Sequence, residues 1–439
     1  MPSTPVPATG SRGVPAWGEA APGPAVGMGW RGDLVTAALA AWLVLGLFVD
    51  GWAHNTRPLL ETFFTPWHAL FYSGFAAVAA WVGWSVSRRR SRSTGAPPRG
   101  SPDPSGSTGA PPRGSPDPSG STGAPPGGSP DRSGPTGGPP RGSPDPSGGV
   151  SWRAAVPPGY GLAVVGLALF LASGVGDMAW HLAFGIEQNI DALLSPTHLG
   201  LFLGALLVVT APLRSAWADP ASDRRAGLGR LLPAVLSATL AGVLVAFMFQ
   251  YLHPVYENVV SLDHLDFLLG SFDAFQVGYV REVSVIAGIA GFLVATVTLF
   301  GPLVWLARHW RLPAGAALLA LGVQVLLMQA VTGFADAGLA VLGVLGAAAV
   351  EGLVLLLRPG GSGSGAGDDG ERWRVRVFAL AAPAAFWGVY LAGIGLHDGG
   401  LGWAPELWGG ALVWSSLTLL GLTALLLPPA AGGSGEARG

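Results

Sequence analysis

One arrangement of carboxylate and imidazole side chains occurs twice in the sequence. Each copy has an aspartate, a histidine four residues later, a glutamate further on, a Pro-x-His segment and a glycine. The first copy comprises Asp50, His54, Glu61, Pro66, His68 and Gly74, and the second comprises Asp177, His181, Glu187, Pro196, His198 and Gly204. Carboxylate and imidazole together form a ligand set for divalent transition metals such as copper, zinc and iron. We therefore expect the Asp and the two His of each copy to bind a metal ion.

The spacing within each copy predicts that its three ligands meet across a helical hairpin. Residues four apart share one face of a helix, as Asp50 and His54 would if the first helix continues through them. Thr65-Pro66 is a typical helix start, so His68 falls in the first turn of the next helix. A serine and a proline occupy the equivalent place in the second copy. The alternative is structural: each Asp–His pair would be a hydrogen bond that ties its hairpin together.

Further acidic and imidazole side chains are candidates for supporting roles. Glu61 and Glu187, in the connecting loops, could be outer ligands or could orient an imidazole. His253, Glu257 and His264 occupy a polar stretch later in the chain. These three could complete a site, receive a metal from outside, or belong to an ordinary solvated loop.

Composition places these residues in a membrane protein. Half of the 439 residues are hydrophobic and only 11% are charged, whereas soluble proteins carry roughly 25% charged residues. The absence of cysteine excludes disulfides, zinc–thiolate sites and iron–sulfur clusters. The net charge of −2 says nothing about nucleic acid, but the chain has no basic patch of the kind that such binding needs, so we expect no nucleic acid partner. The sequence therefore predicts an all-α, multi-pass protein of the plasma membrane.

About ten stretches have the roughly 20 apolar residues that a membrane-spanning helix needs. They are residues 33–54, 66–87, 157–181, 196–216, 229–251, 280–307, 312–333, 336–357, 375–396 and 407–427. Residues 252–279 are too polar to span, and we expect a loop there with a short interfacial helix.

The apolar stretches and the segments between them divide the chain into eight parts. A tail (1–32) precedes the first hairpin (33–87), and a disordered cytoplasmic linker with four 14-residue repeats (88–155) precedes the second hairpin (156–216). Helices five to eight (217–358), a flexible linker (359–373), the last two helices (374–428) and a final tail (429–439) follow.

The arginines predict the orientation of these helices. They cluster after the second, fourth, sixth and eighth apolar stretches, and the positive-inside rule then puts both termini in the cytoplasm. With that orientation only His309 lies inside. The other seven histidines lie on the outer side: His54, His68, His181, His198, His253, His264 and His397. The duplicated motif is therefore expected at the extracytoplasmic face.

The first copy of the motif has a specific resemblance. Residues 50–72, with Asp-Gly-Trp-Ala-His, then Phe-Thr-Pro-Trp-His and the aromatic pair Phe71-Tyr72, resemble the C subunit of the copper membrane monooxygenases, the particulate methane and ammonia monooxygenase family. The resemblance implies that Asp50, His54 and His68 bind copper. The second copy matches less well, because Leu-Ser-Pro replaces Phe-Thr-Pro and the spacing is longer. The family subunit has fewer helices and one such site, so the resemblance supports copper more than it supports monooxygenation.

The sequence leaves several functions open. The preferred interpretation is a copper protein, with zinc or iron as other possible metals, that either activates oxygen or handles copper. It lies in a lipid bilayer, alone, as a homo-oligomer or with further membrane subunits. One alternative is a redox protein that anchors haem between opposed imidazoles. The other is a proton- or ion-coupled transporter that uses the Asp–His pairs as relays.

Overall fold

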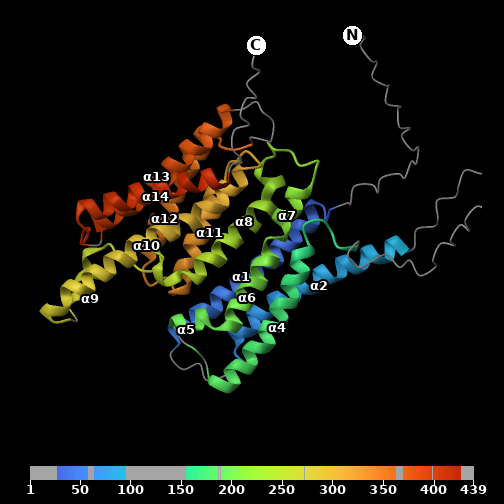
Figure 1. Ribbon diagram of the computed structural model, residues 1–439, viewed down its shortest axis with the longest axis horizontal. Helices are drawn as coiled ribbons and strands as arrows, with labels where there is room; N and C mark the ends of the chain where they lie inside the picture. Colours follow the sequence, from blue (N-terminus) through green and yellow to red (C-terminus); the bar gives the residue numbers. More distant parts are fainter. Residues whose placement is uncertain are drawn as a thin grey trace, which may run out of the picture. The chain divides into compact units, whose positions relative to one another are not determined.

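The computed structural model describes residues 27–57, 64–94, 155–185, 187, 189–270, 272–361, 369–397 and 399–426. These residues are mostly helical and contain no strand, which confirms the all-α prediction (Figure 1). Two units are distinguished, Met1–Ser85 with Val156–Gly439, and Val86–Ala155. In the second unit, helix is described only at the end of α2 and at Ala155. Glu61, the two tails and the four repeats lie outside the described residues.

Nine spans within the described residues are long and apolar enough to cross a membrane. They are formed by α1 (Trp30–Thr56), α2 (Pro66–Thr94), α4 (Gly161–Phe184), α6 (Pro196–Val209) with α7 (Ala211–Ala218), α8 (Leu228–Met248), α10 (Ala274–Ala307), α12 (Ala337–Leu357), α13 (Asp369–His397) and α14 (Pro405–Leu426). The chain is therefore a multi-pass membrane protein. Helix α2 continues through the arginine run after the first hairpin, and α13 begins inside the stretch for which a linker is predicted.

The tenth predicted span is a shorter helix than expected. Helix α11 covers only Ala316–Val331, about 24 Å of helix at 1.5 Å per residue. Gly315 and Gly333 flank it with φ of 88° and 69°, a left-handed conformation that ends a right-handed helix. Helix α11 packs against α1, α8 and α12, so protein surrounds much of its surface.

Glycines set the closest helix contacts in both hairpins. In the first hairpin, a Cβ atom on Gly74 would lie 2.6 Å from the Leu43 Cα atom of α1. In the second, a Cβ atom on Gly204 would lie 2.8 Å from the Phe170 backbone nitrogen of α4. Real Cβ atoms do not approach other atoms so closely. Each helix pair therefore packs backbone to backbone, as small residues allow between membrane helices.

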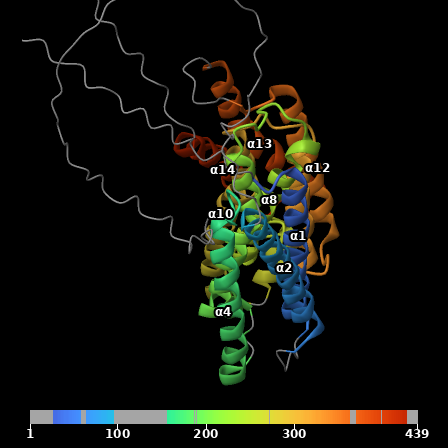
Figure 2. The ribbon, with the colours of Figure 1, turned by 90° about the vertical axis from the view of Figure 1, so that its right-hand side faces the viewer.

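The two hairpins pack against each other through aromatic rings. Phe75 of α2 stacks on Phe170 of α4 with ring centroids 4.3 Å apart, and Phe71 meets the same ring edge-on. Helices α1, α2 and α4 run alongside one another in Figure 2. Helix α8, the most buried of the spans, packs against α1, α6, α10 and α11. This core fixes the ends of α1, α2, α4 and α6, where the motif residues lie.

The polar stretch after α8 does not span. It contains the 3-10 turn η1 (Gln250–Leu252) and the short helix α9 (Leu262–Leu269), which confirms the short helix expected there. The Ser261 side chain caps α9 by accepting a hydrogen bond from the His264 backbone. The Leu262 backbone N–H donates to the Gly400 carbonyl, which ties this stretch to the segment between α13 and α14.

Candidate metal centre

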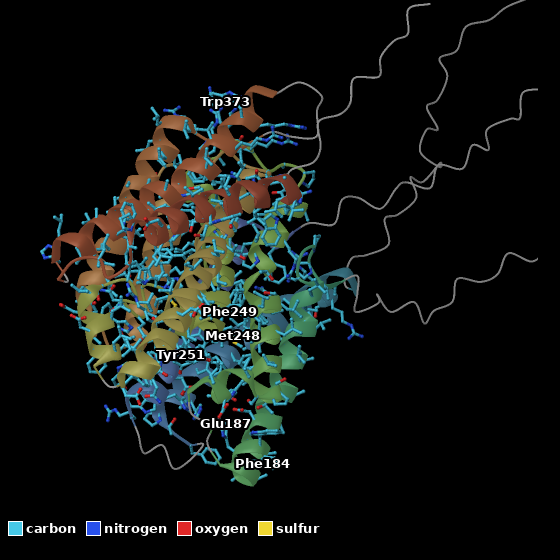
Figure 3. The ribbon with its side chains drawn as sticks, turned by 60° about the vertical axis from the view of Figure 1, so that its left-hand side comes forward. Phe184, Glu187, Met248, Phe249, Tyr251 and Trp373 are labelled. Atoms are coloured by element: carbon cyan, nitrogen blue, oxygen red, sulfur yellow. The ribbon has the colours of Figure 1, made fainter. Side chains whose placement is uncertain are left out.

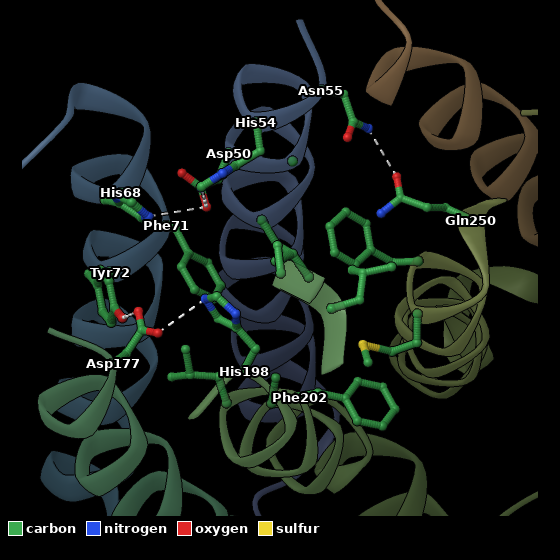
Figure 4. A pocket seen from close by; sticks show the side chains of 18 of the residues that line it. Asp50, His54, Asn55, His68, Phe71, Tyr72, Asp177, His198, Phe202 and Gln250 are labelled. Carbon is green, nitrogen blue, oxygen red and sulfur yellow. Dashed lines mark hydrogen bonds and ion pairs between the residues drawn. The ribbon is translucent and has the colours of Figure 1, made fainter. Parts of the chain in front are cut away.

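The first copy of the motif forms a triad at the junction of α1 and α2. Asp50 and His54 lie one turn apart near the end of α1, and His68 lies in the first turn of α2. The Asp50 Oδ2 atom is 3.8 Å from His54 Nε2 and 3.6 Å from His68 Nε2. All three side chains point into the space between the two helices (Figure 4). The hairpin geometry expected from the spacing is present.

The second copy forms a matching triad at the junction of α4 and α6. The Asp177 Oδ1 atom is 3.5 Å from His181 Nε2 and 3.1 Å from His198 Nε2. A short helix, α5 (Asn189–Leu194), lies in the connection between α4 and α6. In each triad one ligand atom from every residue lies within 4.8 Å of the others, so both groups could hold a metal ion.

The distances in both triads fit coordination of one ion. Nitrogen and oxygen ligands bind such ions at about 2.0–2.2 Å, so ligand atoms that share an ion lie roughly 3–3.5 Å apart. The second triad lies within this range, at 3.1 and 3.5 Å, and the first is slightly wider, at 3.6 and 3.8 Å. Small side-chain adjustments would therefore suffice to bring all three atoms of a triad to one metal.

The two triads lie beside each other, and five of their six residues line one cavity. The Tyr72 hydroxyl of α2 donates a hydrogen bond to Asp177 Oδ2 at 3.2 Å, and the rings of His68 and His181 are 6.3 Å apart. A cavity of about 80 Å³ is lined by Asp50, His54 and His68 of the first triad and by Asp177 and His198 of the second. Figure 4 shows these residues around one space. Sequence spacing could not establish this convergence.

A hydroxyl group orients the second histidine of each triad. Thr65 Oγ1 accepts a hydrogen bond from the backbone N–H of His68 and lies 3.1 Å from the Nδ1 atom of the same residue. In the second triad, Ser195 Oγ accepts a hydrogen bond from the His198 backbone N–H at 3.4 Å and lies 2.8 Å from His198 Nδ1. Each hydroxyl thus caps a helix and engages Nδ1, which leaves Nε2 directed at the aspartate.

His181 has a different second partner. Its Nδ1 atom lies 3.1 Å from the Gly185 carbonyl oxygen and 3.4 Å from Glu187 Oε2. A carboxylate behind an imidazole fixes the ring and makes it a stronger ligand. Glu187 is therefore placed where an orienting residue is expected.

Both aspartates are buried with little charge compensation. Asp50 and Asp177 are 8% and 1% exposed, and no Lys or Arg lines their cavity. Asp50 Oδ1 and His54 Nδ1 are buried without a hydrogen-bond partner. Buried charges and unpaired polar atoms are costly unless something neutralises them. A cation between the side chains would do so, which is the physical reason that the site fits a metal.

The sequence analysis assigns no role to several polar residues of the site. Tyr72 and Thr197 both donate hydrogen bonds to Asp177. Asn55 donates to Gln250 and accepts from Tyr251, which joins the end of α1 to the end of α8. Tyr72 belongs to the aromatic pair on which the resemblance rests. The signal for the others is a polar side chain one turn or less from a ligand or at the end of an apolar helix.

The predicted supporting residues of the later polar stretch lie elsewhere. His253, Glu257 and His264 line a different pocket from the triads. His397 is exposed at the end of α13. Figure 3 places Tyr251, which follows α8, and Glu187 toward one end of the helices and Trp373 toward the other.

Comparison with known proteins adds no assignment to this geometry. No family model, curated protein or solved structure matches the chain. The case for function therefore rests on the residues of the site.

Proposed function

We propose that this chain is a membrane copper protein whose two Asp/His/His triads hold two metal ions side by side at the extracytoplasmic face. The observation that carries the proposal is the convergence of the triads in one cavity. Residues more than a hundred positions apart in sequence, Tyr72 and Asp177, are hydrogen-bonded there. A hydrogen bond that only tied one hairpin together would not require the second triad beside it.

Copper is the metal that this donor set supports best. The ligands are imidazole nitrogens and carboxylate oxygens, and the chain has no cysteine. Among divalent first-row metals, copper binds such sites most tightly. The resemblance of residues 50–72 to the copper membrane monooxygenases favours the same metal. Zinc and iron accept these ligands too, so metal analysis of the purified protein decides between them.

A groove beside the first triad favours oxygen activation over copper handling. The groove lies between α2 and α4 and has an almost wholly apolar lining that includes Phe75, Phe170 and Met178. His68 and Tyr72 line both this groove and the metal cavity. Copper held with an open coordination position supplies redox chemistry with dioxygen. An apolar molecule in this groove would lie beside His68 and Tyr72, whereas copper delivery needs no such groove.

The two alternative functions fit the cavity less well. A cavity of about 80 Å³ has room for ions and a few waters but not for the tetrapyrrole of a haem. A proton relay needs a polar path across the membrane. The buried face of α1 between Thr36 and Asp50 is instead formed by apolar residues such as Ala40, Leu43 and Phe48.

Metal analysis of purified protein tests the proposal. We expect wild-type protein to hold up to two copper ions per chain after loading. Asp50→Ala and Asp177→Ala should each lose about one, because each removes the central ligand of a single triad. His397→Ala, at an exposed histidine, is the matched control and should keep both ions. Wild-type protein that binds no metal, or aspartate variants that bind as much as wild type, would refute the proposal.

A further inference from the structure

The metal cavity has a further polar wall, at the end of α1 and in the turn η1. Gln250 and Tyr251 of η1 line the cavity together with Asn55, which follows His54 in α1. Figure 4 shows Gln250 across the space from His68. Asn55 and Tyr251 are half-buried, whereas Gln250 is only 2% exposed. None of the three residues belongs to a triad, so metal binding alone leaves this wall without a role.

Hydrogen bonds fix the orientation of the Gln250 carboxamide. The Tyr251 hydroxyl donates to Asn55 Oδ1 at 3.1 Å, and Asn55 Nδ2 donates to Gln250 Oε1 at 3.2 Å. The oxygen of Gln250 therefore faces Asn55, and its Nε2 atom, which can only donate, lies on the other side of the carboxamide. Figure 4 shows this nitrogen directed into the space between the helices.

A molecule in the cavity can reach Gln250 Nε2. The side chain lines the cavity, and its only hydrogen bond within the described part of the chain is the one that Oε1 accepts. Asp50 Oδ1 and His54 Nδ1 are fully enclosed as well as unpaired, whereas Gln250 Nε2 is not among such atoms. The unpaired nitrogen thus keeps some surface, and the cavity is where that surface lies.

Gln250 is also the donor that the rest of the cavity lining lacks. Outside the triads, the other polar side chains of the lining belong to Asn55, Tyr72 and Tyr251. Each of these already donates a hydrogen bond to a neighbouring side chain. A buried N–H group without an acceptor is unfavourable, so an acceptor inside the cavity would satisfy Gln250.

The size and the walls of the cavity indicate which acceptor fits. A volume of about 80 Å³ leaves room for only a few atoms. The lining also includes the apolar side chains of Leu47, Phe247 and Met248, and surroundings of low polarity strengthen a hydrogen bond. A small anion meets all three conditions, because it accepts hydrogen bonds, needs little space and is attracted by a metal ion.

We propose that Gln250 Nε2 donates a hydrogen bond to a small anion that occupies the open coordination position of an ion held by the triads. This assignment rests on the proposed function, since the triads supply the cation. The carboxamide adds no charge of its own. It therefore selects for an occupant that accepts a hydrogen bond, while the metal ion provides the electrostatic attraction.

Azide binding to the full-length protein loaded with copper(II) tests the assignment. Azide has three atoms in line, so it reaches further from the metal than a halide does, and its charge-transfer absorption on copper(II) reports binding. We expect Gln250→Leu to bind azide roughly 10- to 100-fold more weakly than wild type, the effect of losing one hydrogen bond to a charged group. Gln250→Glu keeps the oxygen that Asn55 needs and replaces only the donor, so it should lose at least as much affinity.

Two controls separate the donor from the metal site. Gln276→Leu, at an exposed glutamine of α10, should bind azide like wild type. Carbon monoxide, a poor hydrogen-bond acceptor, should bind the reduced Gln250→Leu protein as tightly as reduced wild type, because the open position is unchanged.

Four outcomes would overturn the assignment. They are equal azide affinity of wild type and both Gln250 variants, no azide binding to copper-loaded wild type, equal weakening of azide and carbon monoxide, and a wild-type protein without copper. The first three leave the proposed function standing if the copper content of wild type is as expected. Only the last refutes the proposed function as well.

Discussion

The hydroxyl groups of Thr65 and Ser195 link helix formation to ligand orientation at the scale of single residues. Each hydroxyl oxygen accepts a hydrogen bond from the backbone N–H of the histidine three residues later, in the first turn of the helix. The same oxygen also contacts Nδ1 of that histidine. An oxygen has two lone pairs, so the same atom can accept from the backbone and from an Nδ1–H. The histidine then offers Nε2 to a metal with its ring held in place.

Removing these hydroxyls should weaken metal binding without removing a ligand. For Thr65→Val and Ser195→Ala we expect roughly 10- to 100-fold lower affinity at the affected triad, the usual effect of losing an orienting partner. The loss of the helix cap should also cost about 1 kcal/mol of stability. Competition with a copper chelator measures the affinity.

The two copies of the motif provide the controls for these variants. Thr65→Ser and Ser195→Thr exchange the hydroxyl residues of the two triads and keep both contacts, so they should bind copper like wild type. If Ser195→Ala bound copper as tightly as Ser195→Thr, the hydroxyl would have no orienting role.

Residue types and spacing predict the six residues of the triads but not their surroundings. The four-residue step from Asp50 to His54 and the helix start before His68 follow local rules of helix geometry, which a sequence displays directly. Tyr72 donates to Asp177 across two hairpins, a contact that depends on how α2 meets α4. No local rule fixes that packing.

At the scale of helices, Gly74 and Gly204 determine how closely each hairpin closes. Both belong to the duplicated motif, and each faces the backbone of the partner helix. An added methyl group would have to push backbone atoms apart, because no flexible side chain is there to move. The aspartate and the second histidine of a triad lie on opposite helices, so helix separation would change their distance.

Replacing either glycine by alanine should therefore weaken metal binding, although neither glycine is a ligand. For Gly74→Ala and Gly204→Ala we expect about 1–3 kcal/mol of destabilisation, as for other overpacked interiors, and loss of copper from the triad of the same hairpin. Gly83→Ala is the matched control in α2, because nothing lies within 4 Å of the added carbon. Melting temperature and copper content measure both effects. Equal values for Gly74→Ala and Gly83→Ala would show that the close approach has no bearing on the site.

Helix existence follows from the sequence more reliably than helix length. Apolar stretches of about 20 residues identify the nine long spans, because lipid requires such lengths. The tenth span is shorter because positive φ angles at Gly315 and Gly333 end it. A glycine in a sequence can adopt either sign of φ, so the sequence does not predict where this helix ends. The break between α6 and α7 at Thr210 likewise lies within one predicted span.

At the scale of the whole molecule, the metal cavity is built from two separate parts of the chain. Helices α1 and α2 precede residues 95–154, and α4 and α6 follow them. Each hairpin closes through its own glycine contacts, and the two hairpins meet through the rings of Phe75 and Phe170. The described contacts that form the cavity thus join residues on either side of this interval.

A chain divided in this interval should still form the metal centre. We expect residues 1–120 and 121–439, produced together as two polypeptides, to co-purify and to hold as much copper as the intact chain. Residues 121–439 produced alone should hold at most half as much, because they lack the first triad and because Tyr72 no longer supports Asp177. Failure of the two pieces to associate would mean that covalent continuity is needed for the hairpins to meet.

The charge of the cavity lining bears on the oxidation state of bound copper. Its lining contains two carboxylates, Asp50 and Asp177, and no Lys or Arg. Two cuprous ions would balance those two charges, whereas two cupric ions would leave two positive charges in a medium of low dielectric constant, where uncompensated charge is costly. Charge balance alone would therefore favour the reduced state of the pair, whereas the imidazole and carboxylate ligands themselves favour copper(II). Each oxidation would draw an anion into the cavity with it, so the redox potential of the pair would depend on which anions can enter.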